Sequence, residues 1–168
     1  QVFYGCKNLT AIPYLDTNKV TSMYYTFYSC KKLTTIPHFN TSNVTGMEGI
    51  FYGCDNLETI PQLDTSNVTN MKDAFCSCKK LTTIPQLDTS KVTNMEKIFY
   101  ACTNLTTIPQ LDTSNVTNVQ SMFIYCDNLE SLPKLNFGKV TVLNGIFSVW
   151  NDNKLTDLGG FENLGQAY

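Results

Sequence analysis

The chain has 168 residues, of which 42% are hydrophobic, so it is long enough to form one domain with a sizeable core. Charged residues make up only 15% of it, and the formal net charge is −2. This balance excludes the basic surface that attracts nucleic acids or anionic membranes, and no apolar run is long enough for a membrane-spanning helix. We therefore expect neither nucleic-acid binding nor membrane insertion by this chain.

One interval dominates the sequence, because the same residue types return every 24 residues without insertion. Phenylalanine shows the interval from end to end, at Phe3, Phe27, Phe51, Phe75, Phe99, Phe123 and Phe147. Cysteine, leucine, proline and valine keep the same period. A unit this short cannot bury its own apolar side, whereas stacked units can. The period therefore predicts a solenoid.

Within one unit, residue spacing predicts a short helix followed by a short strand. Four apolar positions are spaced as on one face of a helix, namely Met95, Ile98, Phe99 and Cys102. The run 105–108 has strand character and ends at Pro109, which lacks an N–H to donate. The expected fold class is an α/β solenoid of 24-residue coils, each with a short parallel strand and a short helix.

Two boundaries follow from where the period begins and where it breaks. The six-period solenoid covers 1–147 and begins within a repeat, so we expect the chain to be a piece of a longer protein. Further along, Trp150 stands in place of cysteine, and Gly159 and Gly160 stand in place of proline. A large aromatic residue within irregular chain suits the end of a solenoid, where open core must be covered. Residues 148–168 are predicted to be a C-terminal capping segment.

The repeated motif resembles that of a known family. Phe-x-x-Cys-x-x-Leu-x-x-Ile-Pro, with Val-Thr-x-Met ahead of it, resembles the BspA-like leucine-rich repeats. Leu-Asp-Thr-Ser-Asn-Val-Thr-Asn-Met is similar to the bacterial surface-protein repeat found in mycoplasma lipoproteins. The resemblance implies right-handed coils of the leucine-rich-repeat type and an extracellular or cell-surface location. It also implies a role in adhesion or recognition, and it supplies no catalytic residues.

Six cysteines form one column, namely Cys6, Cys30, Cys54, Cys78, Cys102 and Cys126. A line of thiols is not the tetrahedron of a zinc site, so we expect no metal. Neighbouring coils would bring the Cα atoms within the disulfide range of about 4.4–6.8 Å, which leaves disulfides open. The place of the column on the apolar face favours buried free thiols, a cysteine ladder in the core.

A seventh cysteine, Cys76, lies outside that column and takes the place of a tyrosine. Its position two residues before Cys78 predicts that it lies on the other, exposed side of the predicted helix. There it could allow dimerisation under oxidising conditions, or it could simply be a drifted surface residue. Otherwise we expect a monomer.

Two solvent-facing columns supply the candidate ligand contacts. The first and preferred column follows each proline and varies most, with Tyr14, His38, Gln62, Gln86, Gln110 and Lys134. The second follows each phenylalanine, with Tyr4, Tyr28, Tyr52 and Tyr100, and with Tyr24 and Tyr25 adding to it nearby. Tyrosine is a large, rigid contact residue, but a stacked row of tyrosines can also serve only to cover the flank of a helix.

The remaining polar columns have simpler interpretations. The recurring aspartates, such as Asp64 and Asp88, suit Asx turns, with calcium between coils as the alternative. Threonine pairs such as Thr82-Thr83 form rows that could bind ice, although Glu58 and Glu130 interrupt them. We expect no cofactor.

Catalysis is not expected, because the inventory of reactive groups is too small. The chain has one histidine, His38, between Pro37 and Phe39, and no glycine-rich phosphate loop. The leading hypothesis is a non-enzymatic, surface-exposed binding or adhesion module that recognises a protein or glycan ligand. The alternatives are a structural spacer that presents another domain, and a phage-borne receptor-binding or decoration element.

Overall fold

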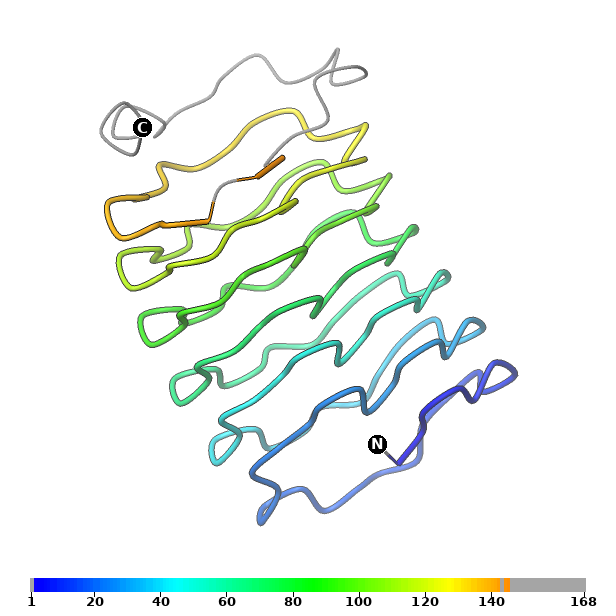
Figure 1. Ribbon diagram of the computed structural model, residues 1–168. Helices are drawn as coiled ribbons and strands as arrows, with labels where there is room; N and C mark the ends of the chain where they lie inside the picture. The colour runs from blue at the N-terminus through cyan, green and yellow to red at the C-terminus, as the bar shows by residue number, and fades with distance from the viewer. Residues whose placement is uncertain (1, 143, 146–168) are drawn as a thin grey trace.

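The computed structural model describes residues 2–142, 144 and 145, and they stack as successive coils in chain order (Figure 1). Coils two to six each begin at a residue that forms a β-bridge to a neighbouring coil, and coil one is the described chain before them. Coil one is 2–21, coil two 22–45, coil three 46–69, coil four 70–93, coil five 94–117 and coil six 118–141. The architecture is thus the expected repeat solenoid. The predicted cap, 148–168, lies outside the described residues.

The interior consists of columns of identical or similar side chains. Phenylalanine rings stack from Phe3 to Phe123, with neighbouring centroids 5.5–5.9 Å apart. Cys, Leu, Ile, Val and Met columns surround this stack, and nearly all of their members are buried. Large rings at regular offsets fill each layer against the next, and this dense packing is what holds a repeat stack together.

The predicted short helix is wrong: in each described coil this stretch is a series of tight turns. In coil five, Lys97 and Ala101 have φ values of 52° and 56°, which no right-handed helix contains. Met95, Ile98, Phe99 and Cys102 are nevertheless all buried. Consecutive turns place the same four residues inward as a helix would, so apolar spacing alone could not separate the two structures.

Backbone hydrogen bonds explain why turns replace the helix. In coil five, the N–H groups of Ile98, Tyr100 and Cys102 donate three residues back, at 3.1–3.2 Å. The N–H groups between them point along the stack instead: Phe99 donates to the Met122 carbonyl at 3.2 Å, and Ala101 donates to the Ile124 carbonyl at 2.8 Å. An α-helix would instead direct its N–H groups, after the first four, to carbonyls four residues back in the same coil. The alternating pattern uses half of them to join one coil to the next, so backbone groups stay satisfied throughout the stretch.

The predicted strand is also not found where it was expected. Segment 105–108 is not a strand, and among the described residues parallel pairing occurs as isolated bridges, at Ser22, Gly46, Asn70, Asn94, Asn118 and Val142. Beside these bridges, threonines donate from coil to coil, as Thr93 N–H does to the Thr69 carbonyl at 2.9 Å. Proline in every coil interrupts a ladder along 105–111. Pairing is therefore concentrated on the other side of the coil.

Side chains complete the joints between coils. Asp64, Asp88 and Asp112 each accept a backbone N–H two residues ahead, at 2.9–3.1 Å, which confirms the predicted Asx turns. The hydroxyl group of that same residue, a serine in each case, followed by this backbone bond, lowers the pKa of each of the three carboxyl groups. Asparagine and threonine side chains bond the carbonyls of adjacent coils; the Asn67 amide, for example, donates to Ser42 at 2.8 Å. Polar side chains on the outside of the stack thus form hydrogen bonds that join adjacent coils.

Candidate functional site

The column after each proline lies at the surface, but much of it is engaged. The amides of Gln62, Gln86 and Gln110 each donate to the backbone carbonyl one coil onward, at 2.6, 2.7 and 2.5 Å. These glutamines therefore join coils as the asparagines do. Tyr14, 82% exposed, and His38 are the open members at the N-terminal end, and Lys134 is exposed at the other.

The tyrosine column is a stack in its N-terminal half. Tyr4 and Tyr28 have centroids 4.5 Å apart, and Tyr28 and Tyr52 have centroids 4.9 Å apart. Further on, Cys76 interrupts the row, and Tyr100 meets Tyr125 edge to face at 5.4 Å. In each coil a turn segment runs up to the column cysteine, and these segments are 2–6, 22–30, 46–54, 70–78, 94–102 and 118–126. We call their outer side the turn face. In coils one to three, tyrosines gather on this face.

Two more tyrosines lie flat on this face because glycines make room for them. A Cβ on Gly46 would lie 2.5 Å from the Tyr24 ring, and a Cβ on Gly49 would lie 2.2 Å from the Tyr25 ring. Corresponding positions in coil four hold Asn70 and Asp73. The glycines of coil three therefore leave the space in which the two tyrosine rings of coil two pack. Tyr24 remains 42% exposed, so its outward side is open to solvent.

Charged side chains continue the turn face beyond the tyrosines. Glu48 accepts hydrogen bonds from the Tyr25 hydroxyl at 2.7 Å and from the Asn70 amide at 2.9 Å. Burial, followed by the bond to Glu48, raises the pKa of Tyr25. Lys72 pairs with Glu96 at 3.1 Å in the next coil. The turn face thus changes from aromatic to ionic between coils two and five.

Asp73 is the unusual member of this ionic region. It is 8% exposed, and its Oδ1 has no hydrogen-bond partner in the part of the chain that the structure describes. Its φ of 55° is in the left-handed region, which aspartate tolerates better than most residues. Burial raises the pKa of its carboxyl group, while Lys72 and Lys97 oppose that shift. The charge of Asp73 also contributes to the raised pKa of Tyr25 and of Tyr52.

The cysteine column is a ladder of free thiols, all buried except the exposed Cys6. Each buried thiol donates to the phenylalanine carbonyl of the preceding coil; Cys78, for example, reaches Phe51 at 3.2 Å. Burial raises the pKa of Cys30 to about 11 and that of Cys78 and Cys102 well above the ordinary value. These thiols therefore stay protonated and serve as hydrogen-bonding core residues.

The expectation that Cys76 is exposed is wrong. Only 2% of this residue is exposed, and burial raises its pKa to about 11. The prediction placed it on the outer side of a helix, whereas the turn backbone lets it fill the gap in the tyrosine row beside Tyr52. A buried thiol does not supply the accessible group that disulfide-linked dimerisation requires.

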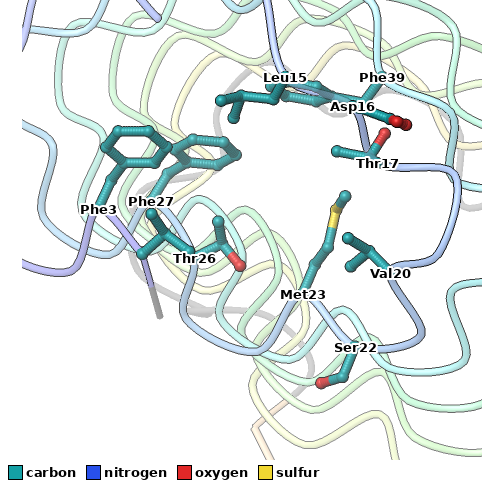
Figure 2. Close-up of a pocket in the computed structure, with 11 residues that line it drawn as sticks. Phe3, Leu15, Asp16, Thr17, Val20, Ser22, Met23, Thr26, Phe27 and Phe39 are labelled. Atoms are coloured by element: carbon teal, nitrogen blue, oxygen red, sulfur yellow. The ribbon is translucent and has the colours of Figure 1, made fainter.

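A cavity of about 220 Å³ opens at coil one (Figure 2). Figure 2 shows Phe3 and Phe27 on one side of it, with Met23 and Val20 on the other. Most of the residues that line the cavity belong to the core columns. The cavity is therefore a part of the hydrophobic core that is open to solvent at coil one. It is separate from the turn face, to which none of its aromatic residues belongs.

Other kinds of site find little support in the part of the chain that the structure describes. No cluster of three or more histidine, cysteine or acidic side chains that could hold a metal ion occurs there. The same residues include no helix that is long and apolar enough to cross a membrane.

Sequence reasoning found the tyrosines but missed Glu48, Asp73 and the glycine seats. A signal was present, because coil three alone has glycine at three turn-face positions, Gly46, Gly49 and Gly53, immediately after the coil with a Tyr24-Tyr25 pair. A tyrosine in one unit followed by a glycine nearby in the next unit indicates that the ring packs where the glycine has no side chain.

Comparison with known proteins places the chain in a family. The model of the family described as "Mycoplasma protein of unknown function, DUF285" matches residues 1–83 and 54–159. A leucine-rich repeat protein from Bacteroides ovatus ATCC 8483, a crystal structure at 1.19 Å resolution, is 16% identical with a TM-score of 0.32, over 91% of this chain and 55% of that one. The chain therefore spans about half the length of that protein. No curated protein matches it significantly. The two matched stretches cover most of the chain, which therefore belongs to the DUF285 family.

Proposed function

We propose that this solenoid is a non-enzymatic binding module that works outside the cell or at its surface, and that the turn face of coils one to three contacts the ligand. The observation that carries the proposal is the cluster of five tyrosines on this face, Tyr4, Tyr24, Tyr25, Tyr28 and Tyr52. Tyr4 and Tyr24 are 53% and 42% exposed. Exposed aromatic clusters on rigid scaffolds are characteristic of contact surfaces.

The rest of the surface supports this choice of face. Threonine, asparagine and glutamine columns are engaged in bonds between coils, so their regularity has a structural cause. The tyrosine cluster, in contrast, requires a local change in the repeat, since two of its rings occupy space that two glycines leave open. Tyr100 and Tyr125 form a second aromatic pair further along the stack, but among the described residues only the rings of coil two lie against glycines of the next coil. This local fit supports recognition at coils one to three.

A binding screen with paired variants tests the proposal. The purified chain is applied to arrays of host proteins and glycans beside the double variant Tyr4→Ser, Tyr24→Ser. Loss of a bound ligand in this variant is the expected result. A second double variant, Tyr14→Ser with His38→Ser, removes the open members of the post-proline column and should bind normally. Each exposed substitution should change stability by only about ±0.5 kcal/mol.

Two results would contradict the proposal. If the Tyr14 and His38 variant loses the ligand and the tyrosine-face variant keeps it, the post-proline column is the contact surface. If the chain binds nothing on the arrays, while a longer protein that contains it does bind, the repeats act as a spacer.

A further inference from the structure

Charge counting on the turn face shows an imbalance. Three carboxylates, Glu48, Asp73 and Glu96, lie on adjacent coils with two ammonium groups, Lys72 and Lys97. Both ammonium groups pair with Glu96, with Nζ to carboxylate distances of 3.1 and 3.9 Å. Subtracting two positive from three negative charges leaves the cluster one positive charge short.

Among the described residues, the two other carboxylates have no ionic partner within salt-bridge distance. Glu48 accepts from neutral donors, the Tyr25 hydroxyl and the Asn70 amide. Asp73, more than nine-tenths buried, leaves Oδ1 without any hydrogen bond. An ionised group that is removed from water is costly unless a partner compensates it. The site therefore favours a ligand that brings a positive charge.

Tyr24 gives such a ligand a second point of attachment. Its ring lies against Gly46, and the residue is still 42% exposed. A cation within about 6 Å of a tyrosine ring face is attracted by the ring quadrupole. Glu48 holds the same position in coil three that Tyr24 holds in coil two. An aromatic face and a carboxylate thus stand side by side at neighbouring levels of the stack.

We propose that this part of the turn face binds a lysine or arginine side chain presented by a protein ligand, with Tyr24 and Glu48 in contact with the cation and Asp73 contributing negative charge from behind. The inference rests on the proposed function and gives it a ligand class. A neutral sugar could also donate hydrogen bonds to these groups, but it would not compensate the excess negative charge of the cluster.

The test titrates the folded chain with a blocked tetralysine peptide, in parallel with a blocked tetraglutamine peptide and with a trisaccharide of N-acetylglucosamine. Backbone amide resonances of Gly46 and Gly49 report binding at the site by nuclear magnetic resonance. We expect tetralysine alone to shift them. Glu48→Gln and Asp73→Asn should each weaken its binding about tenfold, because both remove a negative charge at nearly constant shape.

Glu130→Gln is the matched control, since it removes the same charge from an exposed position in coil six. It should weaken binding less than about twofold, as expected for a distant, screened charge. Asparagine adopts the left-handed backbone of position 73 readily, so Asp73→Asn should fold. Retained amide shift dispersion in that variant confirms this.

Three outcomes would overturn the inference: equal losses in all three variants, unchanged binding in Asp73→Asn and Glu48→Gln, or shifts at Gly46 and Gly49 caused by the trisaccharide and not by tetralysine. None of them bears on the proposed function, which the array screen tests separately and which fails on either of the two results given for that screen. The two proposals can therefore fail separately.

Discussion

In the interior, coil four repeats coil three and coil five almost position for position, with Phe, Cys, Leu and Val each in an unbroken column. On the turn face the same coils differ. Coil two carries Tyr24 and Tyr25, coil three carries glycines beneath them, and coils four and five carry Asp73, Lys72 and Glu96. One backbone thus supports two regions under different constraints. The interior must match its neighbours on both sides, whereas the turn face is free to vary by coil.

Thiol reactivity gives the largest expected contrast between the two regions. The six cysteines other than Cys6 are buried, and their reaction requires opening of the stack. In native protein at pH 8 we expect Cys6 to react with a thiol reagent at once, and the other six to react at least about a thousandfold more slowly. Denaturation should release all seven. Fast reaction of Cys76 in the native state would contradict its burial.

The phenylalanine stack should give the largest effect on stability. Phe75 lies between Phe51 and Phe99, with centroid distances of 5.9 and 5.8 Å, and is 2% exposed. Phe75→Ala should lower the free energy of unfolding by about 3–5 kcal/mol, because it leaves a cavity in the core. Urea denaturation measures the change. A loss below about 1 kcal/mol would show that the layers relax independently.

These interior features were largely predictable, and the reason is physical. Column membership follows from the 24-residue period, so burial of Met95, Ile98, Phe99 and Cys102 could be predicted without the backbone. The backbone itself could not, since helix and consecutive turns satisfy the same spacing. Cys76 shows the consequence, because its predicted exposure assumed the wrong backbone. Glu48 was missed because its partners, Tyr25 and Asn70, lie about one period away, where the sequence gives no pairing rule. Asp73 was missed because its burial depends on the turn backbone.

On the turn face, a single methyl group should have a measurable effect. Gly46→Ala places a Cβ 2.5 Å from the Tyr24 ring, and φ at this glycine is not positive, so the backbone should not oppose the change. We expect a loss of about 1–3 kcal/mol from overpacking, or a displaced ring with a smaller loss. Gly138→Ala, whose Cβ would meet only the Asn136 side chain at 3.2 Å, is the control. Equal effects would argue against a shaped seat.

The smallest expected effect concerns alkaline stability. The neighbouring Cys76 thiol and burial raise the pKa of Tyr52 to about 12, above the ordinary value of 10.0. A folded state that holds its proton more tightly is favoured below pH 10, and this advantage is lost as pH rises through about 12. Wild-type stability should therefore fall more steeply than that of Tyr52→Phe between pH 10 and 12. Urea midpoints at several pH values measure the difference, and parallel curves would contradict the raised pKa.

The alternating use of backbone N–H groups has a consequence for how such a gene can change. Each coil donates to the next through the same positions, so any coil presents the same joint to any other. Duplication, loss or exchange of one whole unit keeps every core column in phase and keeps the backbone hydrogen bonds between coils. The tyrosine rings of coil two are the exception, because they require glycines in the coil that follows. Recombination between the near-identical units can therefore lengthen the solenoid or change the order of the surface residues that each coil presents. The core residues of an added coil already match those of its neighbours.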